Sequence, residues 1–106
     1  MAYKDRQGLP IDVAEWARLR RDTAYCVVDQ DKVDNVMVRT VWEGIEDVVG
    51  GAMFATGISR DAGKTWRTLR EDALAEDGAL VQHSEVVQMV RRGEASGISA
   101  PATGAE

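Results

Sequence analysis

Two short runs of β-branched and aromatic residues flank a polar segment, and this pattern narrows the choice of folds more than any other part of the chain. Residues 23–28 and 36–42 are rich in Val, Thr and aromatic side chains and are too short for typical helices. Residues 29–35 between them are mostly turn formers such as Asp and Asn. We therefore expect an antiparallel hairpin with strands at 23–28 and 36–42.

Two more strands are predicted after this hairpin. Residues 43–51 form a polar loop that ends in two glycines, and residues 52–58 return to an apolar composition. A further short run at 65–69 has the β-branched and aromatic character of a strand. The chain thus supplies about four short strands in sequence.

One helix is predicted on each side of the strands. Asp12 and Glu15 have the spacing of a capping box, which places a short helix at about 12–21. Thr68 and Glu71 have the same spacing and place the start of the C-terminal helix near residue 69. The apolar stripe of this second helix is expected at Ala73, Leu80, Val87 and Val90.

These elements predict one α+β domain. The 106 residues, 44% of them hydrophobic, suffice for a single core and are too few for a propeller or a two-domain enzyme. We expect a two-layer fold in which both helices pack on one face of the antiparallel sheet. Residues 1–11 are expected to be a polar lead-in, residues 12–92 the domain, and residues 93–106 a flexible tail.

The charge balance excludes several classes of partner. The formal net charge is −5 and the pI is about 4.9, whereas nucleic-acid-binding domains normally carry a basic surface. No apolar stretch reaches the roughly 20 residues that a membrane span requires. The polar opening residues predict no signal peptide, and the single cysteine excludes an internal disulfide bond. A cytoplasmic location is therefore expected.

The segment from Ser59 to Trp66 carries the sharpest local motif. It matches the pattern S-x-D-x-G-x-T-W and so resembles the Asp-box of sialidase-type propellers, which is a structural hairpin remote from the catalytic residues. Asp61 is suited to accept backbone amide bonds across a tight turn, and Gly63 to adopt a positive φ. We expect a structural turn made by Ser59, Asp61, Gly63, Thr65 and Trp66, with no glycosidase activity.

Other chemical motifs have weaker support. Gly63-Lys64-Thr65 lacks the glycine that a phosphate-binding loop needs five positions earlier, because Ile58 stands there. Residues 29–34 contain three aspartates but no EF-hand pattern, so a solvated turn is the preferred interpretation. His83, the only histidine, is expected at the edge of the core with one nitrogen hydrogen-bonded. We therefore predict no catalytic residue, no metal site and no cofactor.

The whole order of motifs resembles a family of small uncharacterised proteins found in bacteria and their phages. The residues that carry the resemblance are Glu15–Leu19, Val38–Ile45 and Phe54–Thr56, together with Trp66–Thr68 and the helix up to Val90. The likeness covers roughly residues 12–92, and the chain departs from it in having Ala55 where an acidic residue is usual. It implies a fold and no site residues.

The leading functional hypothesis is a non-enzymatic protein-interaction module. Strands with apolar residues on both faces favour association with another protein or with a second copy, often as a symmetric homodimer. The family resemblance implies a phage or prophage accessory protein that acts on a host factor. The expected interaction residues are Trp42, Glu43, Glu46 and Asp47. The alternative is a small-ligand-binding or minor enzymatic domain that uses the acidic loop at 43–47.

Overall fold

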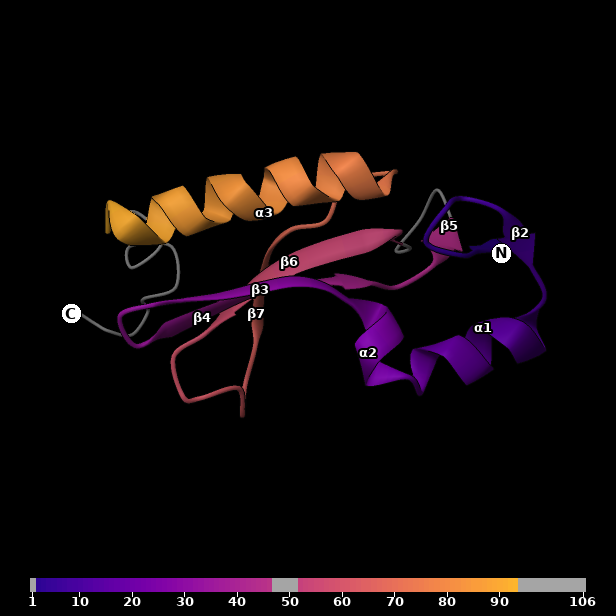
Figure 1. The fold of residues 1–106 in the computed structure, drawn as a ribbon, viewed down its shortest axis with the longest axis horizontal. Coiled ribbons are helices and arrows are strands. Elements are labelled where there is room, and N and C mark those ends of the chain that lie inside the picture. The colour runs from indigo at the N-terminus through magenta and orange to yellow at the C-terminus, as the bar shows by residue number, and fades with distance from the viewer. Residues whose placement is uncertain (1, 47–51, 94–106) are drawn as a thin grey trace.

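A four-stranded antiparallel sheet covered by one long helix forms the body of the protein. The computed structural model describes residues 2–46 and 52–93. The strands run in the spatial order β3 (Val27–Val33), β4 (Val36–Trp42), β6 (Phe54–Ser59) and β7 (Arg67–Arg70). Helix α3 (Glu76–Arg91) lies along one face of this sheet (Figure 1). The α+β fold with a C-terminal helix on an antiparallel sheet is thus confirmed.

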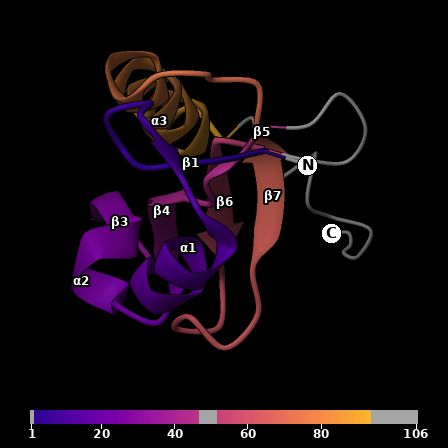
Figure 2. The ribbon, with the colours of Figure 1, turned by 90° about the vertical axis from the view of Figure 1, so that its right-hand side faces the viewer.

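A second, smaller sheet lies at one end of the first. Its strands are ordered β2 (Pro10–Ile11), β1 (Ala2–Lys4) and β5 (Ile45–Glu46). The residues that were expected to be a polar lead-in therefore supply two strands. Helices α1 (Val13–Arg20) and α2 (Thr23–Cys26) connect the two sheets, and they lie below the end of the larger sheet while α3 lies above it (Figures 1 and 2). Helix α1 packs against α2 and β1 rather than on the face that α3 covers.

The predicted strand at 23–28 is wrong in its first four residues. Residues Thr23–Cys26 form α2, because the side chain of Asp22 accepts a hydrogen bond from the amide of Tyr25 and caps the helix. The predicted turn at 29–35 is also shorter than expected. Strand β3 continues to Val33, which pairs with Val36, and only Asp34 and Asn35 form the turn. Asp34 adopts φ 55°, a conformation that Asp tolerates better than most residues.

The C-terminal helix begins later than predicted. Strand β7 extends to Arg70, and α3 starts at Glu76 with Glu76 and Asp77 in its first turn, where acidic side chains favour the helix dipole. The predicted apolar stripe is also displaced, since Leu80 is 41% exposed. The buried face of α3 consists of Ala79, Gln82, His83, Val86 and Val87.

Strict alternation along β4 defines the two faces of the sheet. Val38, Thr40 and Trp42 are fully buried on the side of α3, as expected for every second residue of a strand. Arg39 and Val41 point to the opposite face and are half-buried. Strand β4 therefore presents Thr40 to the side of α3 and Arg39 to the opposite face.

No helix in the described ranges has the length and apolar character needed to cross a membrane.

Candidate functional site

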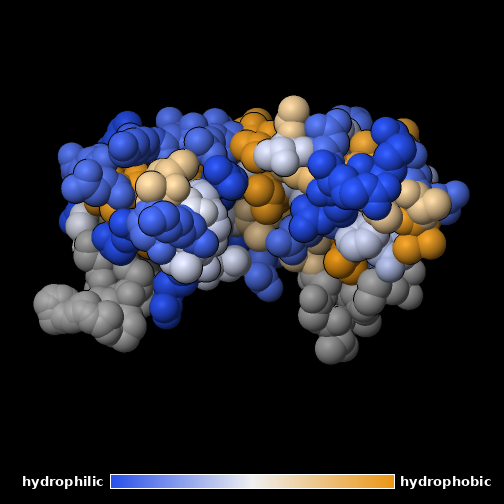
Figure 3. Space-filling view, turned by 90° about the horizontal axis from the view of Figure 1, so that it is seen from below, coloured by the Kyte–Doolittle hydropathy of each residue, from blue (hydrophilic) through white to orange (hydrophobic). Residues whose placement is uncertain are grey.

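The sheet face opposite α3 contains a shallow hollow. Arg39 and Val41 lie on this face of β4, and Glu43, which follows the strand, lines the same hollow of about 200 Å³. Figure 3 shows this side of the molecule, with hydrophobic residues near its middle between hydrophilic ones. The remaining lining residues come from β6, β7 and the turn between them: Ala55, Gly57, Trp66 and Thr68. The hollow thus has an apolar floor with charged residues at its rim.

Arg39 forms one end of this hollow. Its guanidinium carbon lies 4.4 Å from the centre of the Trp66 ring, which is a cation–π contact. Its Nε donates a hydrogen bond of 2.6 Å to Oε1 of Gln30 on β3. These two contacts hold the guanidinium group over the open face.

The turn between β6 and β7 holds Trp66 in place. Asp61 accepts hydrogen bonds from the amide and the hydroxyl of Thr65, and Ser59 Oγ accepts one of 2.8 Å from the amide of Gly63. Gly63 adopts φ 90° and its carbonyl accepts a bond of 3.0 Å from the indole of Trp66. The bonds from Thr65, followed by one from Ser59, lower the pKa of Asp61 to about 2. The Asp-box-like segment therefore positions one wall of the hollow.

Glu43 forms the opposite end. Its backbone is fixed on both sides, because its amide donates to Met53 O at 2.8 Å and its carbonyl accepts from the indole of Trp16 at 2.7 Å. Burial raises the pKa of the Glu43 carboxyl group, an effect that Arg20 opposes and Glu71 increases. The hollow therefore has a cation at one end and a half-buried carboxylate at the other.

Trp42 and Glu46, two of the other expected interaction residues, do not join Glu43 in the hollow. Trp42 is fully buried and donates a hydrogen bond of 2.9 Å to the carbonyl of Lys4, so its side chain is not available to a partner. Glu46 pairs with the amino group of Lys4 at 3.0 Å. Asp47 lies outside the described residues. Within the described part of the loop, Glu43 alone faces the hollow.

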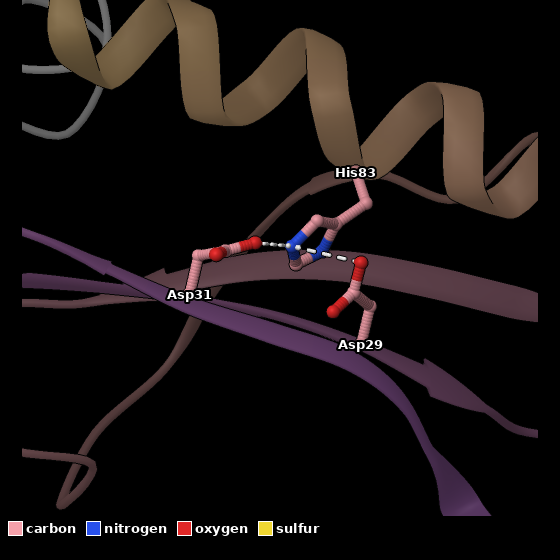
Figure 4. A group of neighbouring side chains, drawn as sticks. All are labelled: Asp29, Asp31 and His83. Atoms are coloured by element: carbon pink, nitrogen blue, oxygen red, sulfur yellow. Dashed lines mark hydrogen bonds and ion pairs between the residues drawn. The ribbon is translucent and has the colours of Figure 1, made fainter.

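His83 lies on the other side of the sheet, between α3 and the strands. Its side chain is only 2% exposed, and both ring nitrogens have partners, where the sequence predicted one. Nδ1 lies 2.8 Å from Thr40 Oγ1, and Nε2 lies 2.8 Å from Asp31 Oδ2. Nε2 is also 3.7 Å from Asp29 Oδ2 (Figure 4). The imidazole therefore links the buried interior to two aspartates on the edge strand β3.

A chain of hydrogen bonds continues inward from His83. Thr40 Oγ1 lies 2.5 Å from Thr56 Oγ1, and the side-chain amide of Gln82 donates to Thr56 at 3.1 Å. If each group donates to the next, the direction is Gln82 to Thr56 to Thr40 to Nδ1. Nε2 then carries the proton that is donated to Asp31. In this tautomer Thr56 Oγ1, Thr40 Oγ1 and both ring nitrogens of His83 each have a partner.

The hydrogen-bond chain from Thr40 through His83 to Asp31 resembles a hydroxyl–imidazole–carboxylate catalytic arrangement only in its residue types. A nucleophilic hydroxyl has to reach a substrate, whereas Thr40 and Thr56 are fully buried under α3. The roles of Thr40, Thr56 and Gln82 were not predicted from the sequence. A signal was available for Thr40. It lies between Val38 and Trp42 at every second position of β4, which is the spacing of residues that face the core.

Within the described part of the chain, one cluster of side chains could hold a metal ion, and it consists of Asp29, Asp31 and His83. One ligand atom from each lies within 4.8 Å of the others.

Comparison with known proteins adds no further information on function: no family model matches the chain, and neither does any curated protein or solved structure. The family resemblance therefore stays a prediction.

Proposed function

We propose that this chain is a small, non-enzymatic protein-interaction module and that its interaction surface is the hollowed face of the sheet. The proposed occupant of this face is a second copy of the same chain. The observation that carries the proposal is the line of Arg39, Val41 and Glu43, whose side chains share one face with opposite charges at its two ends.

This line is complementary to itself. Alternate residues of an extended chain are evenly spaced, so Val41 lies midway between Arg39 and Glu43. A two-fold axis through Val41 places Arg39 of one copy opposite Glu43 of the other, and the reverse pair forms at the same time. Symmetric dimers require such a self-complementary patch. The apolar floor would supply the centre of the interface and the two ion pairs its rim.

The state of Glu43 supports the same arrangement. Burial has removed part of the water around this carboxyl group and raised its pKa, and Arg20 offsets that cost only in part. A guanidinium group from a second copy would favour the ionised form and offset the remaining cost. Arg39 is suited to this role, because its Nε is held by Gln30 while its end lies over Trp66 at the edge of the hollow.

An interaction surface fits this face better than a ligand-binding or catalytic site. The hollow is shallow, and within the described residues Glu43 is the single acidic group that lines it. His83 is buried on the opposite side of the sheet from this hollow. A phage or prophage accessory role and a host factor remain predictions from the family resemblance.

A charge-exchange experiment tests the proposed pairing. In Arg39→Glu the symmetric contact brings two carboxylates together, and in Glu43→Arg it brings two guanidinium groups together. Each variant alone is therefore expected to be monomeric. When the two variants are mixed, one chain carries carboxylates at both positions and the other carries guanidinium groups at both, so both contacts of a mixed dimer are complementary.

The measurement is sedimentation velocity of each variant and of their equimolar mixture, with circular dichroism as the test of folding. We expect two monomers that form a dimer only when mixed. Val81→Lys, on the exposed side of α3, is the control and should sediment like the wild type. Folded variants that fail to associate when mixed, or single variants that still dimerise, would refute the proposed interface.

A further inference from the structure

We propose that Asp29, Asp31 and His83 form a binding site for one divalent transition metal ion, with Zn²⁺ as the ion to test first. The three side chains supply one imidazole nitrogen and two carboxylates, a ligand set that Zn²⁺ accepts in proteins. The site lies on the face of the sheet that α3 covers. It is therefore independent of the proposed interaction surface.

The distances between the ligand atoms fit a metal ion. In a tetrahedral zinc site with bonds of about 2.0 Å, neighbouring ligand atoms lie about 3.3 Å apart. His83 Nε2 lies 2.8 Å from Asp31 Oδ2 and 3.7 Å from Asp29 Oδ2, on either side of that value. Small rotations of the two aspartate side chains would equalise these distances. The ion would take the place of the proton between Nε2 and Asp31.

The fold directs the imidazole toward the two carboxylates. His83 is held in the interior by Thr40, which contacts Nδ1, so Nε2 is the nitrogen aimed at Asp29 and Asp31 (Figure 4). Metal-binding histidines commonly donate the other ring N–H to such a partner, which fixes the orientation of the ring. A threonine hydroxyl is able either to donate to Nδ1 or to accept from it. Thr40 therefore suits both the metal-free and the metal-bound histidine.

The exposure of the three residues gives an ion a route to the site. The side chains of Asp29 and Asp31 are 45% and 51% exposed on the edge strand β3, whereas that of His83 is 2% exposed. An ion would therefore meet the carboxylates first and the imidazole behind them. Three protein ligands also leave a coordination position open to solvent.

The chemistry of the ligands favours a transition metal over Mg²⁺ or Ca²⁺. Those two ions prefer oxygen ligands alone, and Ca²⁺ requires six to eight of them. Here one of the three ligands is a buried nitrogen. Among the divalent transition ions, affinity for such a site rises from Mn²⁺ to Cu²⁺ and is lower again for Zn²⁺.

The experiment uses the full chain without a histidine tag and Zn²⁺ alone as the probe. Isothermal titration calorimetry measures affinity and stoichiometry for the wild type, Asp29→Asn and Asp31→Asn. Asp34→Asn is the matched control, because it removes the same charge from the same hairpin at a residue outside the cluster. Asn also tolerates the positive φ of that position.

The single histidine of the chain supplies a second, independent readout. The imidazole ¹⁵N resonances of His83 are recorded by nuclear magnetic resonance with and without Zn²⁺. We expect one ion per chain, a shift of the Nε2 resonance, and a loss of affinity of at least about tenfold in Asp29→Asn and Asp31→Asn. Asp34→Asn should bind like the wild type.

Three outcomes would overturn the proposal. The first is the absence of stoichiometric binding by the folded wild type. The second is binding that leaves the His83 resonances unchanged, which would place the ion elsewhere on the acidic surface. The third is an equal loss of affinity in Asp34→Asn and in the two cluster variants. Circular dichroism of each variant confirms that the comparison is made between folded proteins.

Discussion

Replacing Thr40 with Val tests the buried hydrogen-bond chain directly. Valine has nearly the shape of threonine but lacks the hydroxyl group that lies between His83 Nδ1 and Thr56 Oγ1. The substitution leaves two buried polar groups with one partner fewer, and each such loss costs about 1–3 kcal/mol. We therefore expect the free energy of unfolding to fall by about 3 kcal/mol, a large part of the total stability of a small domain.

Urea denaturation followed by tryptophan fluorescence measures this change. Thr23→Val is the control, because Thr23 is exposed in α2 and its replacement should alter stability by less than about 0.5 kcal/mol. Thr56→Val and the double variant complete a mutant cycle, with an expected coupling of about 0.5–3 kcal/mol. If Thr40→Val is no more destabilising than Thr23→Val, the hydrogen-bond chain does not stabilise the fold as described.

Three further substitutions have outcomes that follow from the structure. Trp42→Ala should lower the free energy of unfolding by about 3–5 kcal/mol in the same assay, because Trp42 is fully buried; a near-neutral result would contradict its place in the core. Gly57→Ala should lower the thermal midpoint, because a Cβ atom there would lie 2.8 Å from the backbone carbonyl of Arg67; an unchanged midpoint would contradict that close approach. Asp61→Asn should be destabilising at neutral pH, because the pKa of Asp61 in the folded chain, about 2, lies below its unfolded value. The contribution of the Asp61 carboxylate to the free energy of unfolding is present above the unfolded pKa and is lost as the pH falls toward about 2. The free energies of unfolding of the wild type and the variant, measured by urea titration, should therefore converge as the pH falls. A difference that stays constant with pH would refute this assignment.

The elements that depend on local signals were predictable from the sequence. The N-terminal helix begins where the capping box placed it, and Asp12 accepts a hydrogen bond of 2.8 Å from the amide of Glu15. The strand at Val36–Trp42 also agrees with its β-branched composition. In both segments the local preference and the tertiary environment favour the same structure.

The polar strand β3 was not predictable in the same way. Its aspartates are typical of turns, yet Asp29 and Asp31 lie in a strand whose inward face meets His83, 52 residues further along the chain from Asp31. Composition within a short window contains no information about so distant a partner. The candidate metal cluster was missed for the same reason.

The register of the C-terminal helix shows a related limit. The apolar stripe placed Leu80 in the core, whereas the structure buries Gln82 and His83 and leaves Leu80 exposed. The surface beneath the helix explains this result, because it presents the hydroxyl groups of Thr40 and Thr56. Polar side chains that satisfy these groups therefore replace apolar ones on the buried face.

The proposed function is tested most directly by the mass of the wild-type chain in solution. Sedimentation velocity over a range reaching tens of micromolar, at low and high salt, requires no partner and no variant. We expect a dimer with twice the 11.6 kDa mass of the chain, and weaker association at high salt because the rim contacts are ionic. A chain that remains monomeric over the whole range would contradict self-association through the hollowed face of the sheet.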